Sequence, residues 1–190
     1  QLWQLKQEWM KTGKPWPKFI TIEGPGTSPA TPGAITQDQE ADHTMRAMLI
    51  QAAYGVTRHL GWPTPFRCAG AWGEQHYGSG MCDPIPLLTP KVFYSAYATM
   101  TRQLNRMNYV KAIETGSTSV FCLQFKHYKS EELLHVFWTL RGQRPVTIAT
   151  EDRSQNPESR ITVSDQMDNE TALKKKEGKV AFTISSSPCY

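Results

Sequence analysis

The spacing of apolar residues alternates between a helical and a strand pattern through the first 107 positions. Leu2, Leu5 and Trp9 recur at helical spacing, whereas Phe19 and its β-branched neighbours form a short run typical of a buried strand. The predicted elements, in chain order, are a helix over 2–12, a strand over 18–22, a helix over 36–54, a strand over 56–62 and a helix over 90–107. This order is typical of βα units that build a parallel sheet.

Local signals mark where these helices begin and end. Thr36 and Gln39 form a capping-box pattern, and Pro90 suits the first turn of a helix. Gly13 and Gly55 predict left-handed helix stops. The predicted buried stripes are Ala41, Met45, Met48, Leu49 and Ala52 in the second helix, and Phe93, Tyr97, Met100 and Leu104 in the third.

Two parallel strands do not make a stable sheet, because apolar faces and open edges remain uncovered. We therefore expect the other strands to come from an upstream part of the same protein or from another polypeptide. The sequence begins at Gln1, inside a helical pattern and without Met, which indicates a fragment or a processed product.

The pattern changes to period two near residue 108, and short polar turns separate the apolar runs. The predicted strands are 109–114, 118–126, 132–140, 144–149, 160–165, 169–174 and 179–185. This pattern predicts an antiparallel β-sandwich of about 80 residues. The sequence thus predicts an α/β domain over 1–107 and an all-β domain over 108–190.

Composition excludes two classes of partner. The 190 residues carry a net charge of +4, and the densest basic cluster, Lys174 to Lys176, lies beside Glu177 in a predicted hairpin turn. Nucleic-acid binding requires a basic stripe, which the sequence does not contain. No apolar run reaches the length of a membrane span, so no membrane partner is predicted.

The four cysteines show no CxxC pair, and neither they nor the histidines have metal-ligand spacing. The sequence therefore predicts no metal site and no cofactor. Cys68 and Cys82 flank a glycine-rich loop, and whether they form a disulfide stays open. Cys122 lies in an apolar strand and is interpreted as a small core residue.

One acidic residue follows a predicted buried strand directly. Glu23 ends the strand and precedes the tight turn Gly24-Pro25-Gly26. In parallel α/β folds, residues just beyond the carboxyl ends of strands line the functional crevice, where His59 and Trp62 of the next strand are also expected. The residues alone leave two interpretations of Glu23 open: a catalytic carboxylate, or an acid that is solvated or bonded within the turn.

Five segments, in order, resemble the C-terminal part of retaining glycoside hydrolases built on a (β/α)8 barrel followed by a small β-sandwich. They are "FITIEGPG", "QEADHTMRAMLIQAAYGVTRHLGW", "TPKVFYSAYATMTRQL", "VFWTLRGQRPVTI" and "GKVAFTISSSPCY". The first is similar to the seventh barrel strand, which carries the nucleophile in these enzymes. The resemblance implies secretion or a periplasmic location.

The resemblance implies that Glu23 is the nucleophile of a double-displacement reaction on a poly- or oligosaccharide. A retaining enzyme also needs an acid/base carboxyl about 5–5.5 Å away. In this family that residue belongs to the fourth barrel strand, upstream of Gln1, so the isolated chain would hold half an active site. Glu74 is the best alternative within the chain, although a substrate-contact or solvated role suits its loop setting better.

Several side chains near the strand ends are candidates for sugar contact. Trp62 and His59 belong to the second predicted strand, and Trp72, His76 and Tyr77 to the loop after it. An aromatic ring can stack on the apolar face of a sugar, but core or loop packing and a structural histidine remain open. Trp138, in the sandwich, is interpreted as core.

Two other functions remain open. The first is a noncatalytic carbohydrate-binding or scaffold protein that keeps the barrel architecture. The second is an unrelated α/β protein with a β-sandwich interaction domain, in which Glu23 only caps a turn.

Overall fold

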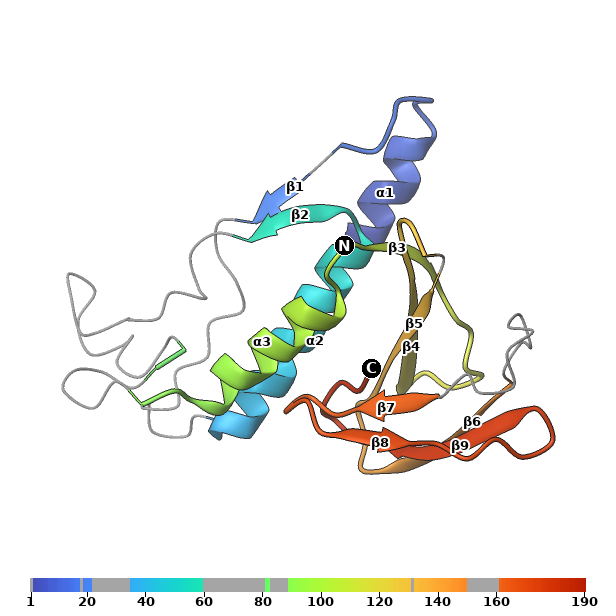
Figure 1. The fold of residues 1–190 in the computed structure, drawn as a ribbon. Coiled ribbons are helices and arrows are strands. Elements are labelled where there is room, and N and C mark those ends of the chain that lie inside the picture. Colours follow the sequence, from blue (N-terminus) through green and yellow to red (C-terminus); the bar gives the residue numbers. More distant parts are fainter. Residues whose placement is uncertain are drawn as a thin grey trace. The chain divides into compact units, whose positions relative to one another are not determined.

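A computed structural model describes most of the chain, and these parts divide into two compact units. The described residues are 2–17, 19–21, 35–59, 81–82, 89–130, 132–149 and 161–190. We call Gln1–Tyr94 the helical unit and Ser95–Tyr190 the strand unit. The helices are α1 (Leu2–Met10), α2 (Gln37–Ala53) and α3 (Val92–Gln103), and the boundary between the units lies inside α3 (Figure 1). None of the described helices is both long and apolar enough to cross a bilayer.

The predicted start of α2 is confirmed in atomic detail. The Thr36 hydroxyl accepts a hydrogen bond from the Gln39 backbone N–H at 3.2 Å, and the Gln39 side chain accepts one from the Thr36 N–H at 3.0 Å. Four of the five residues predicted for its buried stripe are buried, namely Ala41, Met45, Met48 and Leu49. The fifth, Ala52, is half-buried, and Ala53 takes its place in the core.

The turn after α2 requires glycine. Gly55 has φ +85°, and a Cβ at this position would lie 3.3 Å from the Trp16 ring. The Trp16 indole N–H also donates a 2.6 Å hydrogen bond to the carbonyl of Tyr54. Trp16 therefore fixes the tight turn after α2 in two ways: its ring lies against Gly55, and its indole N–H bonds the Tyr54 carbonyl. Gly13, after α1, has φ +70°, so both predicted helix stops are confirmed.

The two strands of the helical unit, β1 (Phe19–Thr21) and β2 (Val56–His59), pair in parallel. Thr21 lies opposite His59, and α2 connects the strands. The βαβ order predicted from the sequence is present in this pair. The extensions of both predicted strands, to 22 and to 62, lie outside the described residues, and the complete barrel stays a prediction.

The end of the third helix was predicted wrongly. α3 stops at Gln103, and Met107 begins a strand instead of ending the helix. The backbone reverses at Arg106, which has φ 62°, and the Arg106 carbonyl then accepts a 3.1 Å hydrogen bond from Tyr128. Met107 pairs with His127, so long-range pairing overrides the helical spacing.

The strand unit contains all seven predicted strands. They are β3 (Met107–Ala112), β4 (Val120–His127), β5 (Leu133–Thr139), β6 (Arg144–Ala149), β7 (Thr162–Ser164), β8 (Glu170–Ala172) and β9 (Lys179–Ile184). They form three antiparallel sheets in the described residues: β3-β4-β5, β6-β9 and β7-β8 (Figure 1). The fold thus combines an α/β part with antiparallel β-structure, while closure into one sandwich stays a prediction.

The second half of β5, residues 136–139, is buried on both faces. On one face, Phe137 packs with Cys122 and Ile184. On the other, Trp138 is 1% exposed and stacks on Phe121 with ring centroids 5.2 Å apart. Cys122 and Trp138 are therefore core residues, as the sequence predicted, and the sheet has no open aromatic face along β5.

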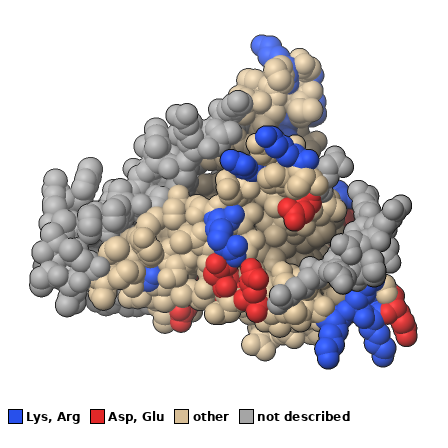
Figure 2. Space-filling view, in the orientation of Figure 1, with Lys and Arg blue, Asp and Glu red and all other residues tan. Residues whose placement is uncertain are grey.

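The basic cluster lies where the sequence placed it, in a hairpin turn. Lys176 and Lys179 exchange backbone hydrogen bonds of 2.8 and 2.9 Å across Glu177 and Gly178. Both central residues have positive φ, 51° and 73°, which defines a type I′ turn. On the face shown in Figure 2, basic side chains form separate small groups, several of them beside acidic ones.

Candidate functional site

The register of β1 and β2 brings two carboxyl ends of strands to one edge. Thr21 and His59, the last residues of the two strands, are direct partners. The predicted nucleophile, Glu23, follows Thr21 by two positions, and Trp62 follows His59 by three. Glu23 and Trp62 themselves lie outside the described residues, and of His59 only the backbone is described.

The other predicted site residues lie in the long loop after β2. Trp72, His76 and Tyr77, together with the alternative carboxylate Glu74, fall outside the described residues. Their roles therefore remain predictions. Among the cysteines, Cys82 is a half-buried free thiol, and its possible partner Cys68 is not among the described residues.

The far end of this loop is tied down by backbone bonds. Cys82 and Pro90 form an antiparallel bridge, and the Lys91 N–H donates a 2.9 Å hydrogen bond to the Met81 carbonyl. Met81 is itself buried. The chain therefore enters α3 from a fixed point in the core of the helical unit.

A buried ion pair joins the start of α3 to the first turn of α2. Lys91 Nζ lies 3.6 Å from Glu40 Oε2, and the two side chains are 1% and 4% exposed. Burial raises the pKa of Glu40, and the ammonium group of Lys91 opposes that rise. The pair therefore joins the helix that connects β1 to β2 with the segment that leads into α3.

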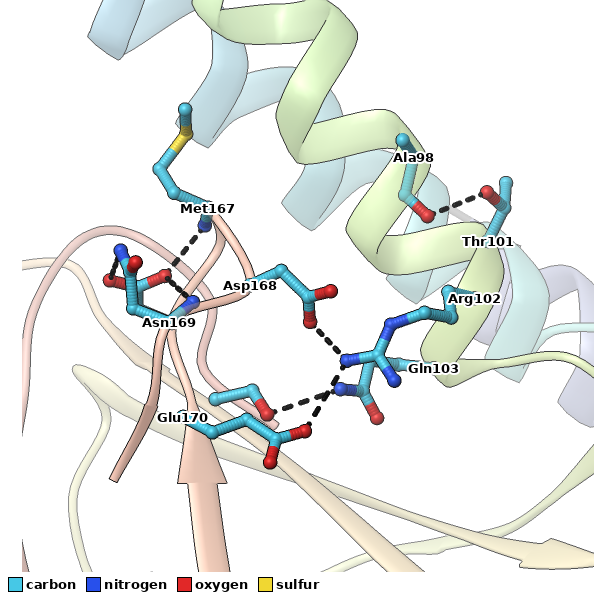
Figure 3. Close-up of polar contacts among 10 residues, drawn as sticks. Ala98, Thr101, Arg102, Gln103, Met167, Asp168, Asn169 and Glu170 are labelled. Carbon is cyan, nitrogen blue, oxygen red and sulfur yellow. Dashed lines mark hydrogen bonds and ion pairs between the residues drawn. The ribbon is translucent and has the colours of Figure 1, made fainter.

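A second polar network lies in the strand unit, at the end of α3. Arg102 pairs with Asp168 and, at 3.6 Å, with Glu170, while the Gln103 amide donates to Ser164 at 3.2 Å (Figure 3). The hydrogen bond to Asp168 is the main cause of the raised pKa of Arg102. These contacts fasten the β7–β8 turn to α3, and the charges satisfy one another, so the network is structural.

The β7–β8 turn is itself shaped by a carboxylate. Asp165 accepts hydrogen bonds from the backbone N–H groups of Met167 and Asn169 at 2.8 and 3.0 Å, and from the Asn169 side chain at 2.8 Å. Partial burial raises the pKa of Asp165, but the bonds from Asn169 and Met167 outweigh it and the net pKa is lowered. Within the described part of the chain, no three His, Cys, Asp or Glu side chains gather as a metal site.

No family model and no curated protein matches this sequence. Among solved structures, the chain matches a family 39 glycoside hydrolase from the gut symbiont Bacteroides cellulosilyticus WH2 with a TM-score of 0.61 and 13% sequence identity. The fold is glycoside-hydrolase-like. The match covers 82% of this chain, which spans only 30% of the length of that enzyme. At this identity the likeness concerns the fold alone.

Sequence reasoning missed both polar networks because each joins residues that are far apart in the sequence. Glu40 directly precedes the predicted core residue Ala41, and Lys91 precedes the apolar stripe of α3. A charge next to a buried stripe is a usable signal, but nothing in the sequence pairs these two charges. Arg102 and Asp168 are also distant in sequence, and only the fold brings them together.

Proposed function

We propose that this chain is the carboxyl-terminal part of a retaining glycosidase in which Glu23 is the nucleophile. The observation that supports this most is the parallel pairing of Thr21 with His59 at the end of each strand. If that register continues, residue 23 lies opposite residue 61, about 5 Å away across adjacent strands. The side chains of Glu23 and His59 would then lie on the same face of the strand pair, because side chains alternate between faces along a strand.

The reaction needs two carboxyl groups with different tasks. The Glu23 carboxylate attacks the anomeric carbon, the glycosidic C–O bond breaks, and the second carboxyl protonates the departing oxygen. Water, deprotonated by that second group, then attacks the glycosyl ester and releases Glu23. We assign the second carboxyl to the part of the barrel upstream of this sequence.

We assign substrate contact to the side chains around this edge. Trp62 would stack on the apolar face of a sugar ring, and His59 would bond a hydroxyl group. Trp72, His76 and Tyr77 would line the same cleft from the loop after β2. The glycoside-hydrolase-like fold supports this assignment, because barrel enzymes carry their sites at the carboxyl ends of strands.

The test uses the complete polypeptide and aryl glycosides. Glu23→Gln should lower kcat at least about 1,000-fold, because the covalent step loses its nucleophile. In Glu23→Ala, added azide should restore turnover and give a glycosyl azide of inverted configuration, which identifies a nucleophile and not an acid/base group. Glu114→Gln, an exposed carboxyl of the strand unit, is the matched control and should keep wild-type activity.

Retained turnover in Glu23→Gln would refute the assignment. A wild-type protein that binds sugars but does not turn them over would instead indicate the noncatalytic carbohydrate-binding function.

A further inference from the structure

A cavity of about 360 Å³ lies within the strand unit. Its wall is built by β5, β7 and the carboxyl terminus, with the end of α3 at one side. Its volume falls within the range typical of small-molecule sites, roughly 300–1,000 Å³.

Aromatic rings form one part of the lining. Phe137, Phe182 and Tyr190 all line the cavity, and the rings of Phe137 and Phe182 contact edge to face at 5.4 Å. Such rings bind the apolar faces of flat or ring-shaped ligands. The lining therefore favours a compact ring over an extended chain.

Polar side chains line the same cavity. They are Gln103, Glu132, His135 and Thr162. The Gln124 side-chain N–H donates to His135 Nε2 at 2.9 Å, which leaves the proton of the neutral imidazole on Nδ1. Burial and the nearby charge of Lys111 lower the pKa of His135 and so favour this neutral form.

Tyr190 adds a donor that the protein leaves unused. The residue is 7% exposed, and its hydroxyl has no hydrogen-bond partner among the described residues. Its backbone, in contrast, is fixed by two 2.9 Å hydrogen bonds to Ser164. A buried hydroxyl without a partner is costly, and a ligand hydroxyl would satisfy it.

The charge of the lining selects among polar ligands. Among the described residues that line the cavity, none is Lys or Arg, and the one acidic side chain is that of Glu132. Phosphates, sulfated sugars and uronic acids would therefore meet no counter-charge. A hydrocarbon would leave the polar groups unpaired. A neutral ring that carries several hydroxyls fits both constraints, because each hydroxyl donates and accepts.

We propose that this cavity is a second carbohydrate site, which binds a neutral sugar residue through the Tyr190 hydroxyl and the surrounding aromatic rings. The described residues that line the site all belong to the strand unit, and binding there requires no hydrolysis. It therefore goes beyond the proposed glycosidase activity and does not depend on it.

The experiment uses the full chain labelled with 3-fluorotyrosine and titrated with monosaccharides, which contain no glycosidic bond that turnover could cleave. The Tyr190 resonance is assigned by its loss in Tyr190→Phe. Titration with neutral monosaccharides should shift this resonance with a Kd on the order of 1 mM, as expected for a ligand of about a dozen non-hydrogen atoms. The corresponding uronic acids should bind at least about 10-fold more weakly.

Variants separate the site from general effects. Binding, followed by calorimetry, should weaken about 2- to 10-fold in Tyr190→Phe and in Thr162→Val, each of which removes one hydroxyl and keeps the side-chain shape. Tyr128→Phe, at a tyrosine that is 51% exposed and does not line the cavity, is the matched control and should bind as the parent does.

Three results would overturn the proposal: a Tyr190 resonance that no neutral sugar shifts up to about 50 mM, equal binding of uronic acids, or unchanged affinity in both hydroxyl-deletion variants. Because the readout is Tyr190 and the ligands contain no glycosidic bond to cleave, these results are independent of whether Glu23 is a nucleophile.

Discussion

The buried pair Lys91–Glu40 gives the sharpest test of how the helical unit is held together. Lys91→Met removes the ammonium 3.6 Å from a carboxylate that is 4% exposed. The remaining charge is then buried without compensation, and such a loss costs about 3–5 kcal/mol. That is a large part of the 5–15 kcal/mol that typically stabilises a domain.

The double variant separates pairing from burial. Glu40→Leu with Lys91→Met replaces both charges by apolar groups of similar size, and such replacements are neutral or stabilising. The double variant should therefore lose less stability than the sum of the two single losses, because neither charge is left buried opposite an empty position. Independent effects would instead add.

The pH dependence provides a second check on Lys91→Met. Burial already raises the pKa of Glu40 above its ordinary value of 4.5, and loss of Lys91 removes the charge that opposes this rise. When the pKa of a carboxyl is higher in the folded than in the unfolded state, its protonation stabilises the fold. This contribution is complete below the unfolded pKa and is lost as pH rises through the folded pKa. The cost of Lys91→Met should thus shrink as pH falls from 7 toward 4.5.

Urea unfolding of the full chain, followed by tryptophan fluorescence, measures these differences. Lys11→Met is the matched control, because Lys11 forms an ion pair with Glu8 at 69% and 68% exposure. Exposed pairs of this kind contribute about 1 kcal/mol or less. If Lys91→Met costs no more than Lys11→Met, or if the double variant loses the sum of the single losses, the reasoning is wrong.

Three further predictions concern the strand unit. Gly178→Ala should lower the free energy of unfolding by about 1–2 kcal/mol, because φ there is +73° and nothing lies within 4 Å of the new Cβ to explain a larger loss; Glu177→Asn in the same turn should raise the urea midpoint slightly. Arg102→Met should cost about 1 kcal/mol or less, with the difference from wild type vanishing in 1 M salt, since its pairs are exposed. Asp165→Asn should reduce the loss of thermal stability at acid pH. Because the pKa of Asp165 is lowered in the folded protein, its stabilising contribution is present above the ordinary value of 3.8 and is lost as pH falls through the folded pKa. An unchanged loss of stability at acid pH would exclude this carboxylate as a cause.

Local signals in the sequence predicted much of the fold. The Thr36–Gln39 capping box, the glycine stops and the hairpin turn at Glu177 each depend on a few neighbouring residues, and all are confirmed. Period two predicted seven strands but not their partners, because alternation records which face is buried and not which strand lies alongside. The ends of elements were predicted less well. Leu140, the last residue of the predicted strand 132–140, is 54% exposed and lies just after β5, which ends at Thr139.

The candidate site stays a prediction, and the polar contacts found elsewhere in the helical unit could not be predicted, for a physical reason. A carboxylate at the end of a predicted buried strand can be recognised within one segment of the sequence. The pairing of Thr21 with His59 shows that the end of this strand lies beside the end of a second strand. Glu40 lies in the first turn of α2 and Lys91 directly before α3, and their pairing exists only once these two segments have packed. A pair at that place favours a rigid start for α2 and α3. Catalysis by Glu23 would benefit, because a nucleophile must be held within a fraction of an ångström of its productive position.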